Sequence, residues 1–464
     1  MFIGRERELA YLAELYQTEK FQMPVIYGRR RVGKTALINE FTKDKECIFF
    51  TGIESTSKQN LENLSRSIFY YLGNEITPVF NTFQTALEYV FKLAEEKRII
   101  FVIDEYPYVA KSYKGISSVL QVLIDKYKDS SKLYLILCGS SMSFMEKQVL
   151  GYQSPLYGRR TAQLRIAPFD FFESRRYFKK FSDEDIAIVY GILGGTPQYL
   201  LQFDDSLSIK NNIINTFLNS ASYLYEEPNN LLKQEVREPA LYNSIISAVA
   251  NGYTKLSDIS SKINEESSVT STYLKNLLAL ELIKKEKPIT EASDRKTAYV
   301  LADNMFRFWY RFIPENASLI ENRYAERAYQ NIEPQIPAYM GAIFEEICRQ
   351  YMWEMNRRGV VAFNDIGRWW GGNPQTKGQE EIDLLAVVDK DTAIFCECKW
   401  TNEFVDLEIL TSLIDKSRLF NYKNKHFYIF SKSGFTKGCK EKSAEAGNVS
   451  LVTFKEMMKE IDLK

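Results

Sequence analysis

Hydrophobic and polar positions along the first 225 residues form short apolar runs separated by helical patterns. Three of the runs are PVIY (24–27), RIIFVID (98–104) and LYLILCG (133–139). Strands that crossover helices bury on both faces have this near-continuous apolar character. The pattern predicts an α/β domain with a parallel sheet over residues 1–225.

Residues 226–320 change to three helical patterns followed by two short strands. This is the arrangement of a winged helix-turn-helix domain, in which residues 267–282 would form the recognition helix. The basic side chains near that helix and its wing are Lys275, Lys284, Lys285, Lys287, Arg295 and Lys296. They predict weak, salt-sensitive binding to duplex DNA. The same domain could equally pack onto the ATPase region.

Residues 330–464 begin with a helical pattern and continue with an extended hairpin, QEEIDLLAVVDKDTAIFCECKW. Two apolar strands flank a polar turn in this stretch. A turn centred on Lys390 places Asp383 opposite Glu397. Because side chains alternate along a strand, Lys399 shares the face of Glu397.

The amino-acid composition limits which kinds of catalytic and metal site the chain can form. The 464 residues carry 60 Lys and Arg against 60 Asp and Glu, so no global field attracts the chain to nucleic acid. The single histidine, His426, excludes multi-histidine metal sites and argues against a Ser-His-Asp hydrolase. The six cysteines are scattered, no apolar run is long enough to span a bilayer, and no signal peptide opens the sequence. We therefore expect a cytoplasmic protein.

A phosphate-binding loop follows the first apolar strand. The stretch GRRRVGKT has two glycines, a lysine and a threonine at the spacing of a P-loop. Such a loop points backbone N–H groups at phosphates, its lysine reaches the β- and γ-phosphates, and its hydroxyl reaches Mg2+. The residues expected to bind ATP here are Gly28, Arg29, Arg30, Arg31, Val32, Gly33, Lys34, Thr35 and Ala36.

Polar residues at the ends of later strands complete the expected ATP site. Asp104 would hold Mg2+ and Glu105 would orient the attacking water, as phosphoryl transfer requires. Ser140 follows the next strand and is suited to contact the γ-phosphate. Arg159 and Arg160 precede another strand and could stabilise charge in the same or a neighbouring subunit, or form a surface turn.

The carboxylates of the hairpin suggest a second site. Asp383 and Glu397 would repel one another unless a cation lies between them. Mg2+ prefers a few carboxylates together with water, and it acidifies a bound water. Lys399 could orient that water or stabilise the developing charge. We interpret the group as a site for phosphodiester hydrolysis.

The motifs of the first region resemble those of the archaeal-type ATPases, P-loop proteins of the AAA+ and STAND group. The resemblance covers residues 2–225 and rests on MFIGRERELAYLAEL, GRRRVGKT, FVIDEYPYV, LILCGSS and GGTPQYL. It implies an ASCE-type five-stranded ATPase core followed by a helical lid. It also implies that residues 4–6 lie near the adenine and Pro197 lies near the nucleotide.

The last region resembles the restriction-endonuclease-like PD-(D/E)xK fold over residues 335–460. The resemblance assigns Glu345 as a metal-binding helix acid, beside the metal-binding Asp383 and the Glu397–Lys399 pair. The family's proline before the aspartate is replaced here by Ile382.

Together these features predict a protein that binds and hydrolyses ATP, acts on DNA, and has a nuclease-like domain dependent on Mg2+. DNA would bind through the winged helix and the last domain, and the ATPase domain could also pair with further copies of the chain. Two other functions fit the pattern. One is a nucleotide-gated signalling switch whose last domain binds without cutting. The other is an origin-initiator-like DNA loader, against which the carboxy-terminal acids argue.

Overall fold

The computed structural model describes residues 2–74, 78–291, 293, 296–374 and 376–462. The chain divides into two compact units. The first comprises Met1–Phe169 and Thr196–Gln198, and the second comprises Asp170–Gly195 and Tyr199–Lys464. Arg295, one of the expected wing charges, lies outside the described residues.

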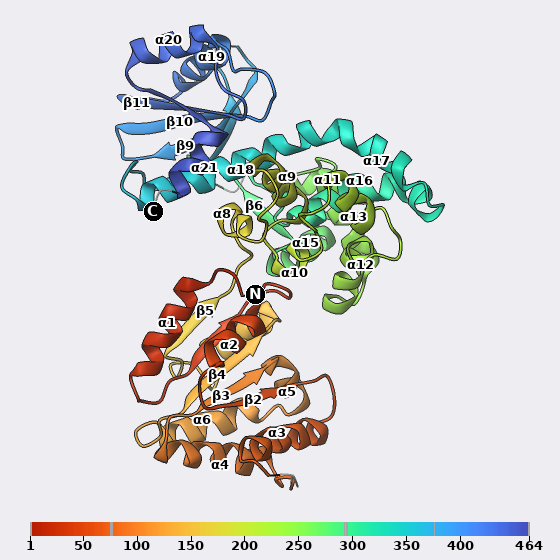
Figure 1. Cartoon of the computed structure of the whole chain (residues 1–464), viewed down its shortest axis with the longest axis vertical. Helices are drawn as coiled ribbons and strands as arrows, with labels where there is room; N and C mark the ends of the chain where they lie inside the picture. The colour runs from red at the N-terminus through yellow and green to blue at the C-terminus, as the bar shows by residue number, and fades with distance from the viewer. Residues whose placement is uncertain (1, 75–77, 292, 294–295, 375, 463–464) are drawn as a thin grey trace. The chain divides into compact units, whose positions relative to one another are not determined.

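The first unit contains a parallel sheet of five strands in the order β2-β3-β4-β1-β5 (Figure 1). Its strands are β1 (Pro24–Tyr27), β2 (Cys47–Thr51), β3 (Ile100–Asp104), β4 (Tyr134–Gly139) and β5 (Ala162–Arg165). All residues of β1, β3 and β4 are buried. The parallel sheet expected from the apolar runs is confirmed.

Helices cover both faces of this sheet (Figure 1). In β3, Ile100 and Val102 pack into one core and Phe101 and Ile103 into the other, as strand alternation requires. The first core lies under α1 (Glu6–Gln17) and α2 (Lys34–Thr42). The second lies under α3 (Ser57–Tyr71), α4 (Phe83–Glu96), α5 (Tyr106–Ser112), α6 (Ile116–Tyr127) and η1 (Met145–Val149), which follows the short α7 (Met142–Phe144).

The second unit begins with helices that the sequence assigned to a lid of the ATPase region. They are α8 (Phe171–Arg175), α9 (Asp183–Leu193), α11 (Ile209–Thr216) and α12 (Tyr223–Glu235), together with the end of α10 (Pro197–Leu200), whose first two residues belong to the first unit. Helix α9 packs on α16 (Asn304–Glu321) and α18 (Ile336–Arg357). Tyr339 of α18, for example, donates to the Gly191 carbonyl over 2.7 Å. The lid helices are thereby grouped with the carboxy-terminal part of the chain.

The middle of the chain forms three helices followed by an antiparallel pair of strands. The elements are α13 (Pro239–Ala250), α14 (Leu256–Ile263), α15 (Ser267–Ala279), β6 (Ile283–Glu286) and β7 (Ala298–Leu301). These are the elements that the pattern predicted. Their interpretation as a DNA-binding winged helix stays a prediction.

A five-stranded mixed sheet ends the chain, in the order β12-β11-β10-β9-β8. Its strands are β8 (Asp365–Gly372), β9 (Gln379–Val387), β10 (Thr392–Lys399), β11 (Asn424–Ser431) and β12 (Val449–Thr453). The helices around it are α18, α19 (Leu407–Ser417), α20 (Lys437–Ala446) and α21 (Phe454–Asp462); α17 (Ala325–Ile332) and η3 (Glu333–Gln335) precede α18. Strands β8, β9 and β10 run antiparallel, whereas β10, β11 and β12 run parallel.

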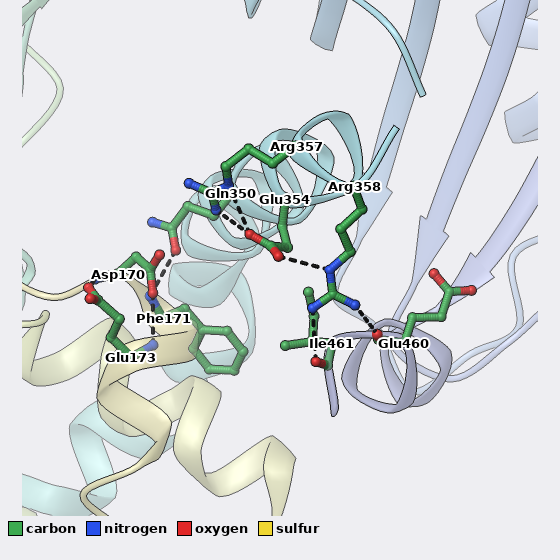
Figure 2. A network of polar contacts seen from close by, with 9 residues as sticks. All are labelled: Asp170, Phe171, Glu173, Gln350, Glu354, Arg357, Arg358, Glu460 and Ile461. Atoms are coloured by element: carbon green, nitrogen blue, oxygen red, sulfur yellow. Dashed lines mark hydrogen bonds and ion pairs between the residues drawn. The ribbon is translucent and has the colours of Figure 1, made fainter. Parts of the chain in front are cut away.

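Polar contacts fasten the long helix α18 at its carboxy-terminal half (Figure 2). The backbone N–H of Phe171 in α8 donates to Gln350 Oε1 over 2.8 Å. Arg358 donates to the carbonyls of Glu460 and Ile461 in α21, over 2.6 and 3.0 Å. Glu354 accepts from Arg358 over 2.8 Å. Helix α18 is therefore tied to both the first and the last helix of the second unit.

Candidate functional site

The P-loop joins the end of β1 to the start of α2. A Cβ atom at Gly28 would collide with the backbone oxygen of Ile166, so only glycine fits there. Gly33 precedes α2 with φ of 88°, a left-handed conformation that glycine adopts without strain. The two glycines expected from the motif thus have separate physical roles, one for close approach and one for the turn.

The loop's own carbonyls hold the side chain of Lys34. Its Nζ donates to the Gly28 and Arg29 oxygens, both over 2.9 Å. The side chain is buried, and burial lowers the pKa of Lys34. The ammonium therefore lies directly against the loop that would hold the phosphates.

The ends of neighbouring strands bring together the other expected groups. Thr35 Oγ1 donates to Asp104 Oδ2 over 2.9 Å, which joins the first turn of α2 to the end of β3. Asp104 is buried, while Thr35 is exposed and accessible to a ligand. Ser140, which follows β4, donates its hydroxyl to Glu105 Oε2 over 2.9 Å. These four residues form one connected polar group at the carboxyl ends of β3 and β4.

Arg29, Arg30 and Pro197 also lie around the loop. Arg29 donates to Thr196 Oγ1 over 3.1 Å, and Arg30 donates to the Tyr108 hydroxyl over 2.9 Å. A Cβ atom placed on Gly33 would lie 3.7 Å from Pro197, so this proline lies beside the loop. Its role at the nucleotide stays a prediction.

Sequence reasoning missed the contact that Arg5 makes with the loop. Arg5 donates to the carbonyl of Val32 over 3.2 Å and to that of Ala167 over 2.5 Å. Its guanidinium also lies 4.2 Å from the ring centre of Phe169. The resemblance placed residues 4–6 near the adenine, but neither it nor the spacing predicted the contacts of Arg5 and Thr196 with the loop, because each meets the loop from a distant part of the chain.

Arg159 and Arg160 lie at the other end of the sheet. Strand β5 pairs in parallel with β1, with Ala162 beside Pro24, the first residue of β1. The two arginines precede β5, whereas the P-loop follows the last residue of β1. Arg159 forms an ion pair with Asp125 at 2.5 Å. A role at the nucleotide of the same subunit does not fit this position; a role in a neighbouring subunit stays a prediction.

The hairpin register expected from the sequence is confirmed where the two strands pair. Ala393 pairs with Val387 and Cys396 with Leu384, as a turn centred on Lys390 requires. The pairing ends there, so Asp383 is not in the ladder opposite Glu397. Its Oδ2 instead accepts from the backbone N–H of Cys398 over 2.8 Å.

A β-bulge explains this departure. On β8, Gly367 pairs with Leu385 and Trp369 pairs with Ile382, so Leu384 and Asp383 together oppose the single residue Arg368. A bulge breaks strand alternation and redirects a side chain. The bulge points the carboxylate of Asp383 at the backbone of β10.

Two lysines neutralise Glu397. Lys399 Nζ lies 2.6 Å from Glu397 Oε1, which confirms that the two side chains share a strand face. Lys416, on α19, lies 3.7 Å from Glu397 Oε2. Glu397 is buried, and among the described residues its Oε2 has no hydrogen-bond partner. Lys416 carried no signal in the sequence, because α19 is brought to β10 only by the fold.

Glu345 lies near enough to Asp383 for that carboxylate to raise its pKa, but Glu345 is paired with Arg368 and does not meet Glu397. Glu345 Oε2 lies 3.2 Å from Arg368 Nε, in an ion pair. Within the described ranges, no group of three or more His, Cys, Asp or Glu side chains is placed to hold a metal ion. The three-carboxylate set that the resemblance implied is therefore not formed.

Glu345 and Glu397 approach β10 from its two opposite faces, which keeps them apart. The Cys398 thiol is hydrogen-bonded to Cys348 of α18, so the face of Cys398 meets α18. Glu397 points to the opposite face, where Lys416 of α19 contacts it. Glu345 belongs to α18 and thus approaches the sheet from the other side.

Burial perturbs two of these acids strongly. Burial, assisted by the neighbouring Glu397 carboxylate, raises the pKa of Asp383 to about 6. Burial also raises the pKa of Glu345 to about 7, against the opposing effect of Arg368. Perturbed acids of this kind are typical of functional sites.

Comparisons with known proteins cover both units. Residues 2–203 match the family described as an ATPase domain predominantly from Archaea. An uncharacterized protein of Methanocaldococcus jannaschii is 34% identical over 408 residues, covering 86% of this chain and 88% of its own length. The chain belongs to this archaeal ATPase family. An uncharacterized ATP-binding protein of Pyrococcus abyssi is 24% identical over 245 residues, or 44% of this chain and 72% of that protein.

A Walker-type ATPase of Pyrococcus abyssi shares the fold of this family member. It aligns with a TM-score of 0.51 at 21% identity, over 67% of this chain and 96% of that one. The chain is thus an ATP-binding, ATPase-like protein. Residues 309–411 match a second family, described as archaeal and bacterial proteins of unknown function. In the part of the chain that the structure describes, no helix is long and apolar enough to cross a membrane.

Proposed function

We propose that this ATPase hydrolyses ATP at the P-loop and uses the nucleotide to control a nuclease-like site in its carboxy-terminal domain. The hydrolysis part is supported above all by the direct contact between Thr35 and Asp104, at 2.9 Å. A hydroxyl and a carboxylate so close together are oxygen donors that suit Mg2+. When bound, Mg2+ would neutralise charge on the β- and γ-phosphates.

The chain's own residues would perform the remaining work of hydrolysis. Lys34 neutralises phosphate charge, and the loop that ends at Gly33 offers its backbone N–H groups to the same phosphates. Glu105 orients the attacking water, and Ser140 holds the Glu105 carboxylate in place through the bond at 2.9 Å. Glu105 has φ of 50°, an uncommon conformation for this residue type that sets its position after β3.

The nuclease-like part rests on the unsatisfied oxygen of Glu397. A buried carboxylate oxygen without a hydrogen-bond partner in the described ranges indicates a missing ligand, since such atoms are normally satisfied. Asp383 supplies a second carboxylate, close enough for the charge of Glu397 to raise its pKa. The two acids fit a Mg2+ site completed by water, and Mg2+ would there activate a water for attack on phosphorus.

In this second site Lys399 would steady negative charge on the phosphate, since its ammonium lies at the Glu397 carboxylate. Asp383 would be held in place by the Cys398 N–H. DNA is the proposed substrate, reached through the winged-helix region and this domain.

A non-cutting nucleotide-gated switch is the second candidate. It is favoured by one observation: Lys399, Lys416 and Arg368 already neutralise the acids, so the domain could be stable without any metal. The two functions differ in whether a phosphodiester bond breaks.

A plasmid cleavage assay with Mg2+, with and without ATP, separates them. Wild type should nick supercoiled DNA, and Asp383→Asn should abolish nicking while ATP hydrolysis continues. Asp365→Asn, at an exposed acid that begins β8, is the matched control and should nick normally. Absence of nicking in wild type under all conditions would support the switch.

A further inference from the structure

Arg368 is surrounded by three carboxylates from three different elements. Its Nε lies 3.2 Å from Glu345 of α18, and its Nη1 lies 3.7 Å from Glu286 of β6. It also forms an ion pair with Glu381 of β9. Within the described part of the chain, its buried Nε makes no hydrogen bond, so the contact with Glu345 is an ion pair without an aligned hydrogen bond. Arg368 thus occupies the position of a cation beside Glu345.

The position of Arg368 along β8 links it to the proposed metal site. It is the single residue that opposes the bulge containing Asp383. A movement of Arg368 would therefore affect two carboxylates, that of Asp383 in the bulge and that of Glu345 on α18.

The segment after β6 holds β8 in place. The backbone N–H of Ile289 donates to the Arg368 carbonyl over 3.0 Å. The Ile289 side chain packs against the core of the last sheet, and a Cβ atom at Gly367 would lie 3.5 Å from it. Part of the expected DNA-binding wing is thus attached to the edge of the carboxy-terminal sheet.

We propose that Arg368 is a positioning residue that competes with a divalent cation for Glu345 and is held in that place by the wing segment through Glu286 and Ile289. This inference rests on the proposed nuclease-like function. While Arg368 neutralises Glu345, only Asp383 and Glu397 remain for the cation. When the wing segment leaves β8, Arg368 is released and Glu345 becomes available to a cation bound at its neighbour Asp383.

In this proposal, DNA that draws the wing away from β8 would break the hydrogen bond from the Ile289 N–H to the Arg368 carbonyl. Until then, the attached wing would keep Arg368 against Glu345.

Calorimetric titration with Mn2+, without DNA or nucleotide, tests the proposal in the full chain carrying Asp104→Asn to remove the P-loop's cation ligand. In this background Arg368→Ala should raise the Mn2+ affinity on the order of tenfold, because a competing positive charge is removed. Adding Glu345→Gln should return the affinity to that of the background. Arg368→Lys, which keeps the charge, should change it less. Arg357→Ala is the control. Arg357 forms an exposed ion pair at the end of α18, the helix that carries Glu345, and its loss should leave the Mn2+ affinity unchanged.

The possible outcomes are distinct. Tighter binding by Arg368→Ala, reversed by Glu345→Gln, supports the proposal, even where the background itself binds no Mn2+. Equal or weaker binding by Arg368→Ala, beside measurable binding by the background, overturns the proposal and leaves the nuclease-like function standing. No binding by any variant overturns both. Should Arg368→Ala fail to fold, Arg368→Gln keeps the side chain's length without its charge and gives the same comparison.

Discussion

The P-loop site and the carboxy-terminal acid site solve the same problem, the placement of acids beside a phosphate, in different ways. At the P-loop, Thr35 contacts Asp104 and Ser140 contacts Glu105, so each acid is held by a neutral hydroxyl. In the last domain, cationic side chains contact Glu397 and Glu345 instead. The first site is assembled for its ligand, whereas the second is neutralised by its own chain and must change to bind a cation.

The largest effect should come from removing the lysine of the assembled site. Lys34→Ala should reduce ATP hydrolysis at least about 100-fold and weaken ATP binding, because the Lys34 ammonium lies directly against the loop that would hold the phosphates. Turnover assays and nucleotide-binding titrations measure both effects. Lys43→Ala, at an exposed lysine just after the same helix, should behave as wild type. Equal activity of the two variants would refute the P-loop assignment.

Glu105→Gln should separate binding from chemistry at the same site. The variant keeps the shape of the side chain but cannot orient and activate water as a carboxylate does, so hydrolysis should fall about 100-fold while ATP binding persists. Ser140→Ala should give a smaller loss, since it only frees the Glu105 carboxylate. The account would be contradicted if Glu105→Gln hydrolysed ATP at the wild-type rate.

The buried acids of the second site should make the free energy of unfolding depend on pH. The pKa of Asp383 is raised from 3.8 to about 6, so its folded state binds more protons than its unfolded state in that range. An acid with a raised pKa makes the free energy of unfolding fall as pH rises through the window from about 4 to about 6. Asp383→Asn should flatten this slope and increase stability at pH 7 by about 1–3 kcal/mol.

Denaturant unfolding between pH 4 and 8 measures that effect. Glu345 should add a similar slope that extends to about pH 7. Asp365→Asn serves again as the control and should keep the wild-type slope. If Asp383→Asn kept the wild-type dependence of the free energy of unfolding on pH, then Asp383 would not be the acid with the raised pKa.

The smallest effect is expected at Arg159. Its ion pair with Asp125 is at the surface, so Arg159→Ala should cost less than about 1 kcal/mol of stability. At low protein concentration, where a single subunit acts, ATP turnover should change less than about twofold. A loss of turnover that appears only at high concentration would place Arg159 at a neighbour's nucleotide. A loss at every concentration would contradict its position at the far end of the sheet.

The comparison also shows what the sequence could predict. The P-loop site is built from contiguous motifs at the ends of buried strands, and the parallel sheet brings those ends together. The hairpin register follows from local spacing around Lys390 and is confirmed for the residues that pair.

The rest of the second site depends on contacts between distant segments. The bulge at Leu384 and Asp383 arises where β9 pairs with β8. The spacing within the β9–β10 hairpin carries no information about that pairing. Glu345 does not join Glu397 because α18 covers the opposite face of β10. The residue that replaces a cation there, Arg368, stands between Gly367 and Trp369 without any motif around it.

Anomalous diffraction from crystals grown with ATP, Mn2+ and a short DNA duplex tests the central claim most directly, because it places the cations in both sites at once. The account predicts one manganese peak beside Thr35 and Asp104, and a second beside Asp383 and the Oε2 atom of Glu397. A peak at the P-loop alone, with Lys399 and Lys416 still against Glu397, would contradict the proposed nuclease-like site.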